Sequence, residues 1–291
     1  MNVEILTQVL VTGLINSAVY VIMAIGLTLV YGATRILNFA HGSFFAWGAY
    51  LAWFLSSGYL QINYALVIVI TIVIMFLFGL VFERAICFPL RRHSEWQINV
   101  IIVTLGSALV LDNLALVFFG PRVKRIPRLL EGNIEIAGVI VDWHDLVILL
   151  IATVVLIIIG LFLKKTRYGM AMRAVAQDAV GAQIVGLHID RVFMYTLGIS
   201  AALAGVSGIL LAPKTLIFPH VGWDIFAKAF VIIVFGGLGS VKGTLYASLI
   251  LGMVEVFVTF FLGAVWGLPV FIGVLLLVLM SRPKGLFGTG K

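Results

Sequence analysis

The sequence has few charged residues and almost no cysteine. Only 11% of its 291 residues are charged and 63% are hydrophobic, whereas about a quarter of the residues in soluble domains are charged. Residues 5–34 and 36–82 contain no Asp, Glu, Lys or Arg. Because a helix needs about 20 apolar residues to cross a bilayer, the second stretch has room for two crossings. The composition excludes an ordinary soluble protein and predicts several membrane-spanning helices.

The chain also lacks the residue patterns of an enzyme or a metalloprotein. Its single cysteine, Cys87, excludes an intrachain disulfide and any cysteine-cluster metal site. The five histidines form no His-Glu-x-x-His pair, and no Gly-x-Ser-x-Gly motif occurs. The glycine-rich stretch 236–244 is not a Walker A loop, because Gly243 rather than Ser or Thr follows Lys242. We therefore expect no catalytic set, no metal, no cofactor and no bound nucleic acid.

The apolar stretches predict an all-α polytopic membrane protein with about eight spans (eight or nine), forming a single transmembrane domain over 1–291. The stretch 236–244 is expected to be a broken or re-entrant segment, and small residues four apart in 198–208 predict closely packed helices. The candidate spans are 6–31, 38–58, 62–83, 96–118, 146–163 and 192–212, followed by a glycine-broken apolar region at 225–281.

The lysines and arginines predict which loops face the cytoplasm. When alternate loops are placed on opposite sides, twelve of the 19 basic residues fall on one side, which includes 84–95 and 164–191. Five fall on the other side, four of them in 120–145. Because basic loops stay on the cytoplasmic side, 164–191 is predicted to be cytoplasmic and 120–145 extracytoplasmic. Within the latter, the β-branched stretch 134–141 predicts a small hairpin.

Ionisable residues inside predicted spans are costly in a bilayer and therefore mark candidate path residues. Asp112 and Asn113 interrupt the fourth span, and Glu255 interrupts the apolar run after Thr244. The alternative is that each carboxylate is neutralised by a structural partner such as Lys228 or Lys242.

A second polar break lies between the first two spans, at Asn38, His41 and Ser43. Asn38 suits a helix cap and Gly42 permits close backbone approach. The break is thus either a capped turn or part of a translocation path lined by His41 and Ser43.

The segment 166–191 predicts one cytoplasmic helix at about 169–186, because Ala, Met, Gln and Arg favour helix and Gly186 suits a C-terminal cap. Small apolar residues three or four apart form a stripe on one face, which must be covered either by the chain itself or by a soluble partner. The stripe consists of Met172, Val175, Ala179, Ala182 and Gly186.

Four motifs, in order along nearly the whole chain, resemble those of the LivH-type permeases of branched-chain amino acid ABC importers. Two departures are Ser43, where many relatives have an acidic residue, and Asp112, where they often have Gln. The motifs are Tyr31-Gly32 with Asn38-Phe39-Ala40-His41-Gly42, a loop with Gly169, Arg173, Ala174, Asp178, Ala182 and Gly186, the stretch Gly236-Gly237-Leu238-Gly239-Ser240, and the tail Arg282-Pro283-Lys284-Gly285-Leu286-Phe287-Gly288.

The resemblance implies a permease subunit in a bacterial inner membrane that imports branched-chain amino acids or a related small solute. It also implies several partners: membrane lipid, a related second permease subunit in a heterodimer, two cytoplasmic ATPase subunits that dock on 164–191, and a periplasmic substrate-binding protein. Two alternatives stay open. One is an ion-coupled secondary transporter or channel that uses Asp112 and Glu255, and the other is a permease of the same architecture for urea, amides or small organic acids.

Overall fold

The computed structural model describes residues 3–287 except 59, 61, 129, 131, 137 and 138, so Gly288 of the tail motif lies outside the described residues. The helices of the long apolar stretches are α1 (Val3–Thr34), α3 (Tyr64–Phe82), α5 (Trp96–Phe119), α6 (Trp143–Lys165), α9 (Ile189–Leu211), α11 (Val241–Leu262) and α12 (Gly267–Ser281), the last preceded by a 3₁₀ turn at Ala264–Trp266. The other elements are α2 (His41–Trp53), α4 (Phe88–Leu90), α7 (Arg167–Gln177), α8 (Ala179–Ile184), α10 (Val221–Gly236), β1 (Asn133–Ile136) and β2 (Val139–Asp142), with π-helical turns at Phe54–Gly58 and Glu83–Cys87.

The prediction of an all-α polytopic membrane protein is confirmed. Seven helices of the described chain are long and apolar enough to cross a membrane. The expected count of eight or nine is reached only when α2 and α10 are added, and these have 13 and 16 residues. The glycine-broken region 225–281 holds most of α10 together with α11 and α12. Three helices therefore occupy this region.

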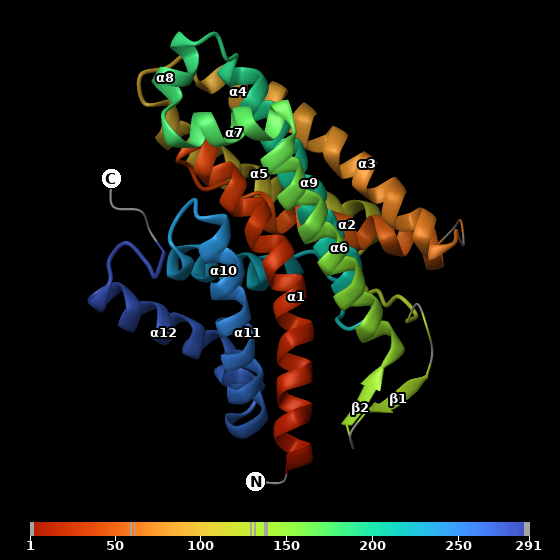
Figure 1. The fold of residues 1–291 in the computed structure, drawn as a ribbon. Coiled ribbons are helices and arrows are strands. Elements are labelled where there is room, and N and C mark those ends of the chain that lie inside the picture. Colours follow the sequence, from red (N-terminus) through yellow and green to blue (C-terminus); the bar gives the residue numbers. More distant parts are fainter. Residues whose placement is uncertain are drawn as a thin grey trace.

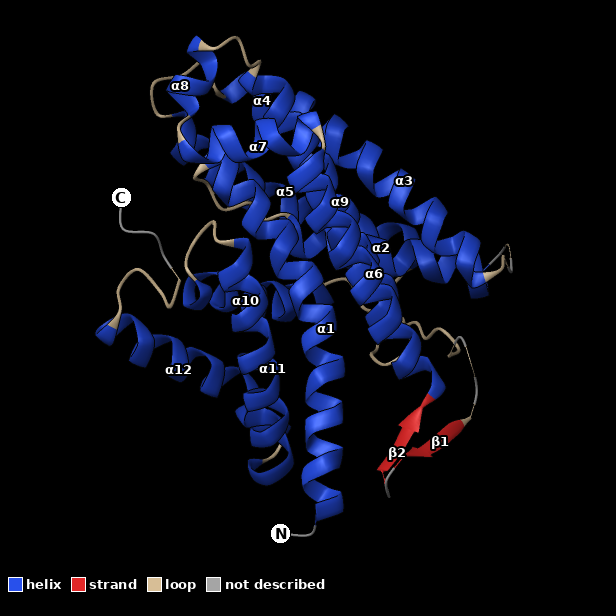
Figure 2. Ribbon diagram, in the orientation of Figure 1, coloured by secondary structure: helices blue, strands red, loops and turns tan. Residues whose placement is uncertain are grey.

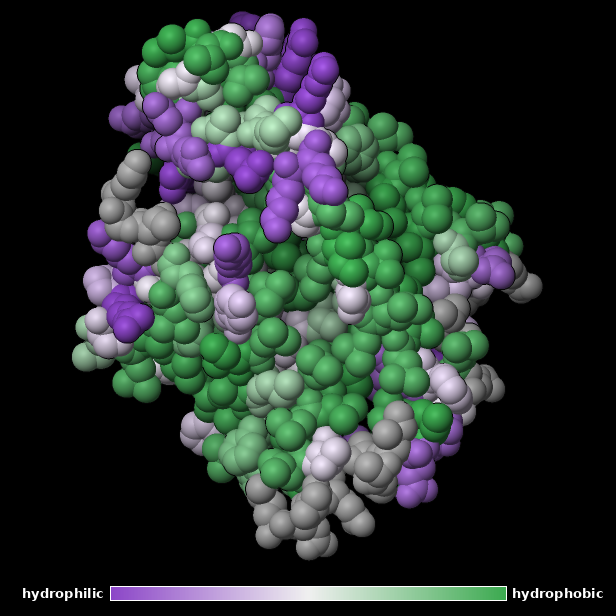
Figure 3. Space-filling model, in the orientation of Figure 1, coloured by the Kyte–Doolittle hydropathy of each residue, from purple (hydrophilic) through white to green (hydrophobic). Residues whose placement is uncertain are grey.

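The two ends of the helix bundle differ. In Figure 1, α4, α7 and α8 lie together at one end, while the start of α1 and the strands β1 and β2 lie at the other. Figure 2 shows that the strands form a small hairpin, as predicted, and Ile134 pairs with Val141 across it. A broad apolar surface separates the two ends, and hydrophilic side chains gather around α7 (Figure 3). The segments predicted to face opposite sides of the membrane thus occupy opposite ends of the bundle.

The helices at the centre are arranged as an inverted repeat. The central pair is α1 and α9, which pack against each other and run in opposite directions (Figure 1). The two halves of the repeat are α1–α2–α3 and α9–α10–α11. In each half the second and third helices pack against the first helix of the other half: α2 and α3 pack against α9, and α10 and α11 pack against α1. Inverted repeats of this kind place a solute site at the contact between the two halves.

Small residues allow the close packing that the four-residue spacing predicted. A Cβ atom built at Gly205 of α9 would lie 2.7 Å from Met75 Cγ, and one at Gly208 would collide with the Phe45 carbonyl oxygen of α2. One at Gly79 of α3 would lie 2.8 Å from Gly198 Cα. No side chain other than hydrogen fits at these points, so the glycines set how closely α2 and α3 approach α9.

Candidate functional site

The helices α2 and α10 begin inside the bundle. The His41 ring, in the first turn of α2, lies 3.0 Å from the Met23 carbonyl oxygen. Met23 is eleven residues before the end of α1, a distance of about 16 Å along the helix axis. The chain therefore folds back along α1 before α2 starts, and α2 is a half-length helix with its N-terminus deep in the protein.

The N-termini of α2 and α10 meet at two glycines. A Cβ atom at Gly42 would lie 2.6 Å from the Gly222 carbonyl oxygen, and one at Gly222 would collide with the Gly42 carbonyl. The first turn of a helix has unsatisfied N–H groups and carries a partial positive charge. Two such ends lie against each other inside the membrane-spanning bundle, which favours a negatively charged group nearby.

The Asp112 carboxylate occupies this junction. Its oxygen Oδ1 accepts a hydrogen bond of 2.8 Å from Ser43 Oγ of α2. The other oxygen, Oδ2, accepts 2.7 Å from Trp223 Nε1 and 3.1 Å from His220 Nδ1, at the start of α10. Asp112 is only 2% exposed, whereas the His220 side chain is well exposed. One buried carboxylate therefore joins α2, α5 and α10, and His220 links it to the surface.

The other path candidates are less closely connected. His41 Nε2 donates to the Met23 carbonyl oxygen, because a carbonyl only accepts, and His41 Nδ1 is hydrogen-bonded to Ser200 Oγ at 3.2 Å. Asn113 faces outward on α5 and donates to the Leu109 carbonyl. The structure thus brings Ser43 and Asp112 together, places His41 in a separate contact with α1 and α9, and leaves Asn113 on the outer face.

Asn38 has a different local role from the cap that the sequence suggested. Its Oδ1 accepts from the backbone N–H of Ala40, two residues on, whereas the N-cap position of α2 is Ala40 and has no side-chain cap. This turn precedes the helix rather than capping it. The amide Nδ2 of Asn38 is buried without a hydrogen-bond partner.

Glu255 belongs to a second buried cluster, in which Lys228 neutralises it. Lys228 Nζ of α10 lies 2.6 Å from Glu255 Oε1 of α11 and donates to the Tyr20 hydroxyl of α1 at 3.2 Å. This is the structural ion pair foreseen as an alternative for Glu255. The pair ties α10 to α11 and α1.

The predicted single helix at 169–186 is wrong, because Asp178 divides it. Asp178 has an extended backbone (φ −152°, ψ 103°), and its side chain accepts from the Val180 N–H to cap α8. Asp favours such caps over helix interiors because its side chain competes for backbone donors. Gly186 ends α8 with φ +88°, as a C-terminal cap requires.

Three of the five positions in the apolar stripe of this segment are covered by the chain itself, whereas Ala179 is half-buried and Gly186 is exposed. Met172, Val175 and Ala182 are buried, and α7 packs against α1, α6 and α9. Gly169 lies against the backbone of Phe162 and Leu163. Of the two covers foreseen for these positions, the chain's own helices are the one observed.

A different set of side chains, on α8 and at Val185 directly after it, is free to meet a partner. Ile184 is 81% exposed and Val185 is 77% exposed, and Val180 is also largely exposed. They form an apolar patch at the tip of the bundle, visible over α8 in Figure 3. Arg173 and Asp178 are exposed nearby in the sequence, while Ala174 is half-buried. This patch was missed because the sequence analysis followed a longer, unbroken helix.

His220 and Trp223 were not among the predicted site residues, although the sequence carries a signal for the first of them. Phe39-Ala40-His41-Gly42 at the start of α2 has a counterpart in Phe218-Pro219-His220-Val221-Gly222 at the start of α10. Comparison of the chain with itself would have paired these two helix starts and added His220 to the candidate residues.

Half-length helices that meet inside an inverted repeat are an arrangement by which transporters form a solute path. The fold and the site therefore define a multi-pass membrane permease, and the chain is not an enzyme. A family model described as branched-chain amino acid transport system, permease component, matches residues 9–280. The chain belongs to this family, whose relatives are permeases of the inner membrane.

Named relatives cover almost the whole chain. The high-affinity branched-chain amino acid permease protein BraD of Pseudomonas aeruginosa is 31% identical over 97% of this chain and 95% of its own length. The corresponding LivH protein of Escherichia coli K12 is 30% identical with the same coverage. The permease protein LivM of Salmonella typhimurium is 26% identical over 92% of this chain and 67% of its own length. No solved structure matches the chain.

Proposed function

We propose that this chain is one of two related permease subunits of an ATP-driven importer of branched-chain amino acids. The observation that carries the proposal is the family match over residues 9–280, together with relatives named for this transport. Similarity to LivM as well as to LivH supports pairing with a second, related permease in a heterodimer.

In this proposal two ATPase subunits dock at the end of the bundle that carries α7 and α8. The basic residues there, such as Lys164, Lys165, Arg167 and Arg173, support a cytoplasmic location. The docking segment includes Gly169, Arg173, Ala174, Asp178, Ala182 and Gly186, and its contact surface is the exposed apolar patch Val180, Ile184 and Val185. ATP is hydrolysed on those partners, and a periplasmic binding protein delivers the solute to the opposite end, which carries 120–145.

The deciding experiment compares the chain alone with its complete complex in lipid vesicles. The complex is expected to accumulate leucine only when ATP is present on the ATPase side. The chain alone should accumulate nothing under a proton or sodium gradient. Uptake by the chain alone would support the ion-coupled alternative, and ATP-driven uptake of urea, amides or small organic acids instead of leucine would correct the substrate.

Substitution of Asp112 by Asn is expected to lower uptake per assembled complex about tenfold or more. Asn removes the negative charge at the two helix N-termini and replaces one acceptor oxygen by an N–H that faces donors, and a hydrogen bond to a charged group contributes about 1.5–3 kcal/mol. The measurement is ATP-dependent leucine uptake, normalised to the amount of complex. Asp224→Asn, an exposed acid in the first turn of α10, is the matched control. Equal uptake by both variants would remove Asp112 from the path.

A further inference from the structure

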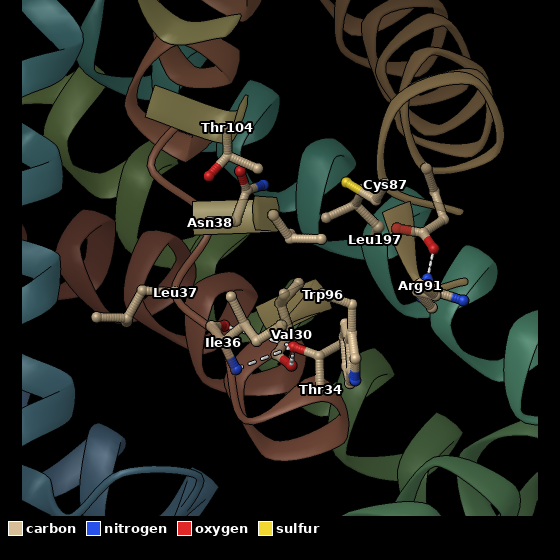
Figure 4. Close-up of a pocket in the computed structure, with 12 residues that line it drawn as sticks. Val30, Thr34, Ile36, Leu37, Asn38, Cys87, Arg91, Trp96, Thr104 and Leu197 are labelled. Carbon is tan, nitrogen blue, oxygen red and sulfur yellow. Dashed lines mark hydrogen bonds and ion pairs between the residues drawn. The ribbon is translucent and has the colours of Figure 1, made fainter. Parts of the chain in front are cut away.

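A small pocket lies near the end of the bundle that carries α4, α7 and α8. Five segments meet around it: the end of α1, the chain before α2, the π-helical turn Glu83–Cys87, α5 and α9 (Figure 4). Its volume is about 20 Å³, which is enough for one or two water molecules and far less than a small-molecule site needs.

The pocket carries two polar groups of opposite character. The Glu83 carboxylate on its wall is only 4% exposed. Asn38 contributes a buried amide N–H donor that has no hydrogen-bond partner, and the bond from the Ala40 N–H to its Oδ1 fixes the orientation of the amide. Buried polar groups without partners are rare and costly in native proteins. An acceptor for the Asn38 N–H is therefore the missing component of this pocket.

Apolar side chains form most of the remaining wall. Val30, Leu37, Val100 and Leu197 come from four different segments and surround the two polar groups. A carboxylate suits an ammonium group, an amide N–H suits a carboxylate, and aliphatic walls suit a branched apolar side chain. These three features match an α-amino acid with an aliphatic side chain.

Arg91 now occupies the cation position beside Glu83. Its guanidinium pairs with the Glu83 carboxylate and, at 2.9 Å, with Asp190 Oδ1, and it lies 4.4 Å from the centre of the Phe193 ring. Burial lowers the pKa of Arg91, and the hydrogen bond to Asp190 opposes this shift. Asp190 is exposed and lies in the first turn of α9, which the short linker 185–188 joins to α8. A movement of the α7–α8 segment that carries the start of α9 with it would pull Arg91 away from Glu83 and widen the pocket.

We propose that this pocket is the closed form of a solute site on the cytoplasmic half of the path, where Glu83 binds the ammonium group and Asn38 the carboxylate of an aliphatic amino acid. The inference rests on the proposed import function and adds the residues that recognise the solute. Release of Arg91 through Asp190 opens the site when the ATPase subunits move the α7–α8 segment.

Cys87 provides a reporter, because it lines the pocket and is the only cysteine of the chain. The experiment measures N-ethylmaleimide labelling of this chain in the complete complex during ATP turnover, with leucine, isopentylamine or isocaproate added. Leucine is expected to slow the labelling. Each analogue, which lacks one charged group, should need about a tenfold higher concentration for the same protection.

Two isosteric variants separate the roles. Glu83→Gln should weaken protection by leucine about tenfold and leave protection by isocaproate unchanged. Asn38→Asp keeps the acceptor of the turn but removes the N–H donor, so it should weaken protection by leucine and not by isopentylamine. Glu95→Gln, at an exposed position before α5, is the matched control. Asp190→Asn should slow labelling without solute, because Arg91 then stays paired with Glu83 when the α7–α8 segment moves.

Three results would overturn the site: no labelling of Cys87 during turnover, labelling that leucine does not slow, or a Glu83→Gln complex that leucine protects as well as the wild type. Leucine uptake by the wild-type complex is measured in the same vesicles. Normal uptake with unprotected Cys87 rejects only this site, whereas absent uptake rejects the proposed substrate.

Discussion

Substitution of Ile184 by Glu is expected to detach the ATPase subunits from the permease and to abolish ATP-dependent uptake. Ile184 is almost fully exposed at the tip of α8, so it contributes little to the fold of the chain. In a docked complex it would be enclosed, together with Val180 and Val185, in an apolar contact. A carboxylate buried there without a partner loses its hydration and destabilises the contact by several kcal/mol. We therefore expect at least a tenfold loss of ATPase subunit on purification.

The measurement is the ratio of ATPase subunit to permease after purification, followed by uptake in vesicles. Ser94→Glu is the control, because it adds the same charge at an exposed position in the loop between α4 and α5, at the same end of the bundle. Normal ATPase retention in Ile184→Glu would show that the patch on α8 is not the docking surface. Loss of retention in both variants would indicate a general charge effect.

The membrane-spanning helices were the most predictable part of the structure. Their length is fixed by the bilayer and their ends by the first polar residues, so gaps between charges located α5 and α6 within a few residues. The division of 225–281 was harder, because α10 has only 16 residues and its start is defined by the contact of Gly222 with Gly42. Such a contact between distant residues has no local signal.

The segment 166–191 also shows that contacts between distant residues cannot be read from a local pattern. Its periodicity correctly predicted an apolar stripe that needs a cover, but periodicity does not identify the cover. Ala182 faces the chain's own helices, so a bulky residue there would displace α8 itself. The predicted helix also ran through Asp178 without a break. Asp prefers to cap a helix with its side chain, and it does so here at the start of α8.

The site was predictable in its residues but not in its connections. The cost of a carboxylate in a membrane singled out Asp112 and Glu255. The two carboxylates have different contacts in the structure. Asp112 is hydrogen-bonded to residues at two helix N-termini, whereas Glu255 is neutralised by Lys228. Only the fold shows that α2 and α10 begin at the same place.

Substitution of Gly222 by Ala is expected to destabilise the permease and to abolish uptake. The new Cβ would collide with the Gly42 carbonyl, a backbone atom that cannot rotate away. Overpacking costs about 1–3 kcal/mol even where side chains yield, and more where backbone must move. The starts of α2 and α10 would separate, and Asp112 could no longer bond to both Ser43 and Trp223. Thermal unfolding in detergent and uptake in vesicles measure the two effects.

The control is Gly273→Ala, inside α12, where nothing lies within 4 Å of the new Cβ. This substitution should be neutral or should stabilise the protein by up to about 1 kcal/mol. If Gly222→Ala unfolded at the same temperature as Gly273→Ala and transported normally, the two half-length helices would not be held in contact by these glycines.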